Sequence, residues 1–168
     1  MLESTVRALT SAGWAPGRRA DTAPFTKALL DAGYEVFPKL VEFLAEFGGL
    51  SISGSGSVTV RFDVPQILAS LRQTYDDEGL DEYASRVGMR WSLIGIVSMR
   101  EPTPNAQDWD LTLMITDKGI VHGVGDGYEQ VAGSVDDETL MDNLCRGLWA
   151  ERIDWRFEPA PGYPRVRR

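Results

Sequence analysis

Side chains that commonly carry catalysis are scarce in this chain of 168 residues, which has one histidine, His122, and one cysteine, Cys145. His122 lies two residues from both Ile120 and Val124, and this period of two is typical of a strand residue that packs with its apolar neighbours. A Ser-His-Asp triad would have to recruit this single histidine, and nothing near it in the sequence supports that role. We therefore predict that His122 is a half-buried packing residue and not a general base.

The sequence also lacks the pattern of a metal site. Several ligands must lie close together to hold a metal, and with one His and one Cys only an all-carboxylate oxygen site is possible. The acidic stretches at 21–26 and 76–82 lack the regular ligand spacing and the closing glutamate of a calcium-binding loop. The sequence therefore predicts no metal and no cofactor.

Two glycine-rich stretches match catalytic loops only in part. Gly123, Gly125 and Gly127 would suit a phosphate cradle, but the stretch lacks the Lys-Ser/Thr ending of a nucleotide-binding loop and does not open directly into a helix. A turn between a strand and the closing helix explains these glycines more simply. The serines of 53–57 alternate with glycine in a predicted hairpin turn, whereas a nucleophile elbow lies between a strand and a helix. We predict that the protein is not an enzyme.

The most distinctive surface candidate is the acidic run from Tyr75 to Tyr83. Solvent or a basic partner must relieve the repulsion among its carboxylates, and tyrosines suit an interface because they bury area at a low entropic cost. In the alternative interpretation, the acids favour a helix N-terminus and the tyrosines pack inward. Both interpretations stay open, and they are compatible with each other. The candidate partner-binding residues are Tyr75, Asp76, Asp77, Glu78, Asp81, Glu82 and Tyr83.

Charge and composition narrow the class of partner. The chain carries 25 acidic and 17 basic side chains, a formal net charge of −8. Such a protein should repel nucleic acids and membrane surfaces and attract basic partners, although an acidic surface also serves solubility. A single cysteine rules out an internal disulfide framework, and no apolar run reaches the roughly 18 residues of a membrane span. Because the start lacks the apolar core of a signal peptide, we predict a cytoplasmic protein.

Hydrophobic periodicity predicts helices first, then a sheet, then one more helix. Apolar residues at helical spacing indicate helices over 2–12, 22–33, 36–47, 63–75, 78–88 and 134–149. Alternating and β-rich runs indicate strands over 50–52, 58–62, 89–99, 109–115 and 120–124, with an edge strand at 153–157. The predicted fold class is α+β, with N-terminal helices, a mostly antiparallel mixed β-sheet and a C-terminal helix in a single domain. We place this domain at 1–150 and a partly disordered C-terminal extension at 151–168.

Local signals set the ends of two of these helices. Gly48 and Gly49 are predicted to stop the helix at 36–47 as a left-handed C-terminal cap. Ser134 and Asp137 have the spacing of a capping box before the closing helix. That helix carries Cys145 on its apolar side, where a buried structural thiol is expected. The apolar stripe of the helix at 36–47 consists of Val36, Phe37, Leu40, Val41, Leu44 and Phe47. Lys39, Glu42 and Glu46 occupy the opposite side of this helix.

Several short motifs follow one another in order from Leu2 to Leu148. Two of them are Gly-Trp-x-Pro-Gly-Arg, which ends at Arg18, and Glu-Phe-Gly-Gly-Leu, which begins at Glu46. They are followed by Val-Arg-Phe-Asp at 60–63, by the run at 113–124 and by the closing helix. In their order and spacing these motifs resemble the third class of the SUKH superfamily of immunity proteins. The motif residues singled out as structural are Gly13, Trp14, Pro16, Gly17, Arg18, Gly48 and Gly49.

The resemblance implies a single α+β domain that catalyses nothing. Members of this class are mostly bacterial proteins that bind and neutralise a cognate toxin, often a nuclease or deaminase domain of a polymorphic toxin from the same cell. The shared motifs maintain the fold, so no catalytic residue is carried over, and the toxin contacts differ from one pair to the next. His122 departs from the class, in which an aromatic residue such as tyrosine is expected. The tail after Leu148 lies outside the resemblance.

The corner at 11–21 has two interpretations. Alone, the adjacent Arg18 and Arg19 suggest a bound anion. Its place in the ordered series of motifs instead indicates a structural joint. In that joint Trp14 packs against the core, Pro16 and Gly17 shape the turn, and Arg18 pairs with an acid or caps a carbonyl. Arg19 is then the more exposed charge.

Three functional hypotheses follow, and they are given in order of the support that the sequence offers for each. The first is a non-catalytic immunity protein whose acidic surface covers a basic toxin domain. The second is an intracellular adaptor for protein–protein contacts without a toxin partner. The third is an enzyme that acts through carboxylates and the glycine loop at 123–127, and it would need acids with raised pKa values in a deep pocket.

Overall fold

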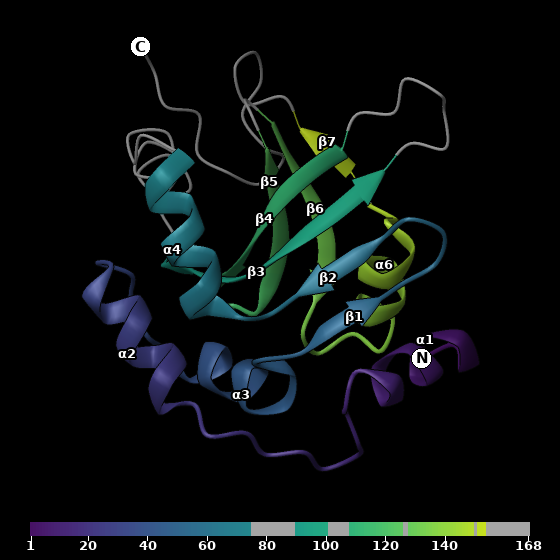
Figure 1. Ribbon diagram of the computed structural model, residues 1–168, viewed down its shortest axis with the longest axis horizontal. Helices are drawn as coiled ribbons and strands as arrows, with labels where there is room; N and C mark the ends of the chain where they lie inside the picture. The colour runs from purple at the N-terminus through teal and green to yellow at the C-terminus, as the bar shows by residue number, and fades with distance from the viewer. Residues whose placement is uncertain (75–89, 101–107, 126–127, 150, 154–168) are drawn as a thin grey trace.

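The computed structural model describes residues 1–74, 90–100, 108–125, 128–149 and 151–153 (Figure 1). The described helices are α1 (Glu3–Ser11), α2 (Ala23–Asp31), α3 (Pro38–Phe47), α4 (Val64–Thr74) and α6 (Leu140–Arg146). The described strands are β1 (Ser51–Ser53), β2 (Thr59–Arg61), β3 (Trp91–Arg100), β4 (Asp108–Thr116), β5 (Ile120–Gly125), β6 (Tyr128–Ser134) and β7 (Glu151–Ile153). The predicted α+β class, with helices first and a helix near the C-terminus, is confirmed.

The strands form one sheet in chain order from β1 to β7. Each strand pairs antiparallel with the next, so every described pairing is antiparallel and the sheet is a simple meander. In Figure 1, α2 and α4 lie on the left of the sheet, α3 lies below it, and α6 lies on the right beside β1 and β2. This arrangement leaves the lower end of the sheet surrounded by helices.

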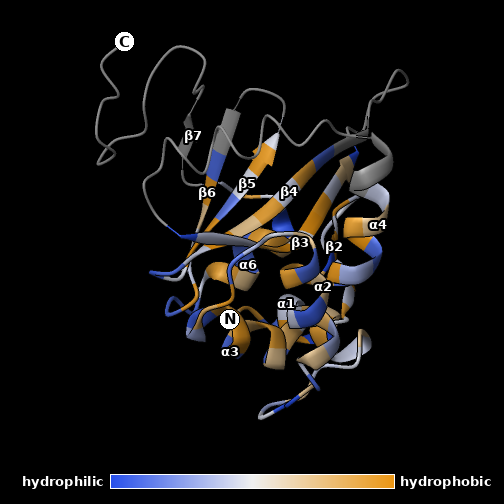
Figure 2. Cartoon of the chain, turned by 90° about the vertical axis from the view of Figure 1, so that its left-hand side faces the viewer, coloured by the Kyte–Doolittle hydropathy of each residue, from blue (hydrophilic) through white to orange (hydrophobic). Residues whose placement is uncertain are grey.

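The core lies where the helices meet the strands. Residues Trp91–Gly95 of β3 are all buried, so both faces of the sheet are covered at this end of the strand. Beneath them Phe43 and Phe47 of α3 pack on Phe62, with ring centroids 5.2 and 6.1 Å from that ring. Figure 2 shows hydrophobic residues gathered in α3 and along the central strands. The burial of these apolar side chains is the main stabilising contribution that the fold offers.

Helix α3 begins two residues later than the periodicity predicts. Proline fixes φ near the helical value and is favoured in the first turn, and Pro38 is the first residue of the helix. Phe37 before it is extended, with φ −139° and ψ 162°, and its ring is buried. The predicted stripe is otherwise close to the observed one, except that Phe43 is also buried while Val36 and Val41 are only half-buried.

The cap at the end of α3 differs from the predicted pair of left-handed glycines. Gly49 has φ +78°, but Gly48 has φ −54° and is not left-handed. Gly48 is required by space instead, because a Cβ atom there would lie 2.6 Å from Cε2 of Phe25 and would also collide with the carbonyl oxygen of Leu44.

The segment between β5 and the last helix is a strand rather than a turn. Residues Tyr128–Ser134 form β6, whose Ser134 pairs with Ile120, so the predicted helix over 134–149 is shortened to α6. Ser134 and Asp137 therefore do not form a capping box. The Asp137 carboxylate instead accepts a hydrogen bond from the backbone N–H of Thr139, at 2.9 Å, within the turn that leads to α6.

The last described strand lies next to β6. Residues Glu151–Ile153 form β7, which pairs with Glu129–Val131. This strand starts earlier than the edge strand predicted at 153–157, and residues 154–157 lie outside the described residues, as does the predicted helix at 78–88. The division into a domain at 1–150 and an extension at 151–168 stays a prediction.

Candidate functional site

The two glycine-containing motifs of the N-terminal half contact each other. Trp14 is buried, and its indole Nε1 donates a hydrogen bond to Oε1 of Glu46 at 3.2 Å. Arg18 donates from Nη1 to the backbone oxygen of Glu46 at 2.6 Å and from Nη2 to that of Gly48 at 2.8 Å. Carbonyl groups at a helix C-terminus have no partner within the helix, and the guanidinium supplies one here. The corner thus holds the end of α3.

This geometry also explains the glycines of the corner. Gly13 follows α1 with φ +93°, and Gly17 has φ +78°. Both values lie in the left-handed region, which glycine adopts without the steric cost that other residues meet. Pro16 and Arg19 are exposed at the rim of the corner. The guanidinium of Arg18 donates its hydrogen bonds to backbone carbonyls, so this side chain stabilises the fold and does not bind an anion.

The acidic run from Tyr75 to Tyr83, which the sequence singled out as a partner surface, lies outside the described residues. Its role in binding stays a prediction.

The single histidine lies deeper than the sequence predicts. His122 in β5 is 2% exposed, opposite Met114 of β4 and Val131 of β6. Desolvation by burial lowers the pKa of His122 from 6.5 to about 4. The imidazole is therefore neutral near pH 7 and lies away from the solvent, as a packing residue does.

The single cysteine is buried, as predicted. Desolvation, and secondarily the nearby carboxylate of Asp142, raise the pKa of Cys145 to about 11. A nucleophilic cysteine needs a lowered pKa, so this thiol is poorly suited to catalysis.

Asp142 joins the last described helix, α6, to the start of the first helix, α1. It is buried in α6, and its two carboxylate oxygens accept hydrogen bonds from the backbone N–H of Leu2 at 2.9 and 3.0 Å. A carboxylate that receives an N–H at the start of a helix satisfies an otherwise unpaired donor and is favoured by the helix dipole. Sequence reasoning missed this contact, because helical periodicity does not reveal a cap that comes from a distant helix.

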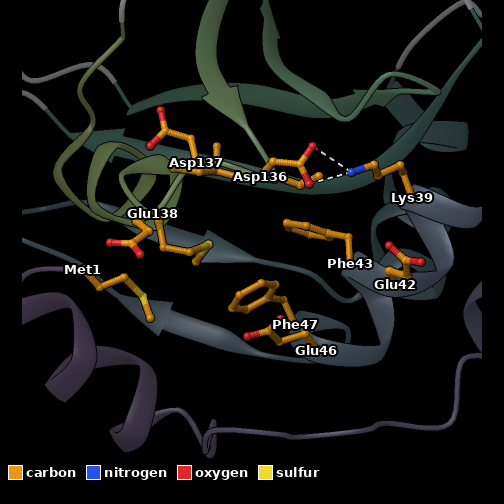
Figure 3. Close-up of a pocket in the computed structure, with 12 residues that line it drawn as sticks. Met1, Lys39, Glu42, Phe43, Glu46, Phe47, Asp136, Asp137 and Glu138 are labelled. Atoms are coloured by element: carbon orange, nitrogen blue, oxygen red, sulfur yellow. Dashed lines mark hydrogen bonds and ion pairs between the residues drawn. The ribbon is translucent and has the colours of Figure 1, made fainter.

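A concave site of the described part of the chain lies between α3 and the turn that precedes α6 (Figure 3). We call it the α3 groove. It is open to solvent and has a volume of about 470 Å³. It is lined by Met1, Lys39, Glu42, Phe43, Glu46, Phe47, Val135, Asp136, Asp137, Glu138, Leu140 and Met141.

Charge in the α3 groove is strongly one-sided. Five carboxylates line it against a single lysine, Lys39, whose Nζ contacts Oδ1 and Oδ2 of Asp136 at 2.5 and 2.7 Å. Hydrogen bonds from the backbone and side chain of Thr139 lower the pKa of Asp137. Nearby like charges with little compensation create a negative potential that attracts cationic groups.

The base of the groove is apolar. Phe43 and Phe47 pack on each other with centroids 5.0 Å apart, and Figure 3 shows both rings between the two acidic walls. Met1, which is 47% exposed, lies at the end of the groove opposite Lys39. Sequence reasoning placed Glu42 and Glu46 on the polar side of the helix but missed the groove, because the second wall comes from a turn about ninety residues further along the chain.

The residues that line the groove include no serine, threonine, cysteine or histidine. In the described ranges, no three or more His, Cys, Asp or Glu side chains are grouped so that they could hold a metal ion. None of the described helices has the length and apolar character needed to cross a membrane. Carboxylates above aromatic rings are suited to contacts with a basic protein surface.

Comparison with known proteins identifies the family. The family model described as SUKH-3 immunity protein matches residues 1–147. Searches of the curated proteins and of the solved structures found no match. The matched segment includes the corner at Trp14, all of α3 and the turn before α6, so it contains both walls of the α3 groove. This chain belongs to the SUKH-3 immunity protein family.

Proposed function

We propose that this protein binds and neutralises a cognate toxin without catalysing a reaction. Membership of the SUKH-3 immunity protein family, over 147 of the 168 residues, is the observation that carries this proposal. The buried positions of His122 and Cys145 agree with it, because each side chain is removed from solvent and has a pKa unsuited to acid–base or nucleophilic work near pH 7.

The partner is proposed to be a basic toxin domain of the nuclease or deaminase type, carried by a bacterial polymorphic toxin. Domains that act on nucleic acid present positive charge to the phosphate backbone. The net charge of −8 and the acidic walls of the α3 groove are complementary to such a surface. Complementary charge accelerates association, and a fast-binding inhibitor protects the cell that makes the toxin. We place this encounter in the cytoplasm, where a buried thiol such as Cys145 stays reduced.

The direct test is co-expression. Each toxin domain encoded beside this gene is expressed in a bacterial host, alone and together with this protein. The proposal expects one such domain to stop growth alone and to be harmless together with the protein, and the two to elute as one complex in size-exclusion chromatography. If every neighbouring domain remains toxic in the presence of well-folded protein, the assignment to toxin immunity is wrong for this chain, and an adaptor without a toxin partner becomes the better account.

A further inference from the structure

We infer that the α3 groove is the docking surface of this protein, and that it takes a segment of the partner in which an apolar side chain is flanked by lysine or arginine. The inference deepens the proposed function and rests on it for the identity of the partner. It is carried by the shape, the charge and the apolar base of the groove.

The groove has two acidic walls that face each other. Glu42 and Glu46 come from one side of α3, while Asp137 and Glu138 come from the turn that precedes α6. Figure 3 shows these carboxylates on both sides of the opening. A chain segment lying in the groove would therefore meet negative charge on each flank, which suits basic side chains that point outward in both directions.

Most of this negative charge is not compensated inside the groove. The positive groups of the lining residues are Lys39, which already pairs with Asp136, and the α-amino group of Met1. The carboxylate of Glu46 accepts a hydrogen bond from the indole N–H of Trp14, and because this donor is neutral it does not compensate the charge of the carboxylate. Phosphate groups and anionic lipid surfaces are repelled by such a site, whereas lysine and arginine side chains are attracted to it.

The apolar base distinguishes the groove from a merely acidic patch. Phe43 and Phe47, which are 4% and 9% exposed, belong to the core and leave only a small part of their surface in the groove, whereas Met1, at 47% exposed, is the most accessible apolar side chain of the lining. Methionine side chains adapt to different apolar partners, and aromatic rings add a polarisable surface. An apolar side chain of the partner would pack against Met1 and the exposed part of the two rings, surrounded by a polar rim.

The walls are held in place before any partner arrives. Arg18 and Trp14 fix the end of α3, the clamp from Lys39 to Asp136 joins the two walls, and the Asp137–Thr139 hydrogen bond shapes the turn. A site that is ordered in advance loses less entropy when it binds. The contacts that maintain the fold thus also fix the spacing of the carboxylates.

The first experiment uses a synthetic peptide with two arginines, a leucine, a tryptophan and two further arginines in that order. Its binding to the full protein is followed by titration, with backbone amide NMR shifts to locate the site. We expect shift changes concentrated at 39–47 and 135–141, and no binding of a peptide in which glutamate replaces arginine. We also expect a peptide with serine in place of leucine and tryptophan to bind at least about tenfold more weakly. Shift changes centred elsewhere, or equal binding of the serine peptide, would overturn the inference.

The second experiment changes the walls. Glu42 and Glu138 are exposed, so the double variant Glu42→Lys/Glu138→Lys should fold, and circular dichroism and the Tm check this. The variant Glu42→Gln/Glu138→Gln removes the two negative charges without reversing them, and it replaces the lysine variant in the test if that variant does not fold. The matched control is Asp110→Lys, an exposed position on β4 that lies away from the groove lining. We expect the lysine variant to weaken peptide binding about tenfold or more, the glutamine variant less, and the control by less than about twofold.

The same variants in the co-expression assay separate the inference from the proposed function. Neutralisation by wild type and the Asp110→Lys control, but not by Glu42→Lys/Glu138→Lys, supports both. Neutralisation by all three proteins leaves immunity in place and removes the groove as the toxin contact. A peptide that binds in the groove while wild type neutralises no toxin supports a basic-segment docking site and rejects the immunity function. Equal weakening of peptide binding by Asp110→Lys would show non-specific charge attraction and would overturn the inference.

Discussion

At the scale of single residues, Arg18 shows how a motif that suggests chemistry can serve structure. Its guanidinium makes two hydrogen bonds to backbone oxygens at the end of α3, at 2.6 and 2.8 Å. The sequence correctly limited the choices for this residue to an acid or a carbonyl. It could not say which carbonyls, because the receiving helix end lies about thirty residues away and its distance from Arg18 depends on the packing of α3.

The first prediction concerns this side chain. Arg18→Ala should lower the free energy of unfolding by about 2 kcal/mol, because it leaves two helix-terminal carbonyls without their charged donor. Arg18→Lys should recover part of the loss, since one ammonium group cannot reproduce the fork of a guanidinium. The control is Arg19→Ala at the exposed neighbour, with an expected change within about 0.5 kcal/mol. Urea denaturation measures all three, and equal values for the two alanine variants would contradict the role given to Arg18.

The second prediction concerns the pH dependence that His122 introduces. Its pKa in the folded protein is about 4, below the 6.5 of an unburied imidazole, so the unfolded chain binds the proton more readily. The contribution of His122 to the free energy of unfolding is therefore complete above pH 6.5. It is lost as the pH falls from 6.5 to about 4. The loss over that window should be on the order of 3 kcal/mol.

The measurement compares wild type with His122→Gln, whose side chain is neutral at every pH. Urea unfolding across the same window should show a steeper loss of stability in wild type than in the variant. The absolute stability of the variant is not the readout, because glutamine packs differently at this position. Parallel curves would mean that the imidazole does not titrate on unfolding.

At the scale of elements, the helices with strong periodicity were predictable and the short strand β6 was not. The stripe that includes Leu40, Leu44 and Phe47 defines α3 because a 3.6-residue period has few alternatives. The glycines at 123–127 predict a turn into the last helix, but the chain continues through β6 before that helix begins. The reason is tertiary, since β6 is stabilised by pairing with β5 and β7 on its two sides. Only part of the candidate site followed from the sequence, namely the polar face of α3.

The third prediction tests the two glycines that end α3. Gly48→Ala places a methyl group 2.6 Å from the Phe25 ring and against the carbonyl of Leu44, so it should cost about 2 kcal/mol or more. Gly49→Ala has room for the methyl group, with Cζ of Phe25 at 3.5 Å, but has φ +78°, so it should cost about 1 kcal/mol. Thermal and urea unfolding give the order of the two variants. A larger loss for Gly49→Ala would show that backbone conformation, and not space, selects the glycine pair.

At the scale of the whole molecule, the site is assembled by the fold from segments that are far apart in sequence. Met1, α3 and the turn at 135–139 meet because α6 packs on β6 and because Asp142 holds the start of α1. No local pattern predicts that meeting, whereas the net negative charge is visible from composition alone and leads to the hypothesis of a basic partner. The fold class followed from the order of the elements, and the family followed from ordered motifs, two of which contact each other through Trp14, Arg18 and Glu46.

The central claim is that an acidic surface of this protein receives a basic toxin domain. The most direct measurement is the association rate constant between the protein and the toxin domain that it neutralises, followed from about 50 to about 500 mM NaCl by stopped-flow fluorescence. We predict that the rate constant falls about tenfold or more over this range, and that Glu42→Lys/Glu138→Lys lowers the rate at low salt and flattens the dependence. A rate constant that is independent of salt, or one that the groove variant leaves unchanged, would contradict this account.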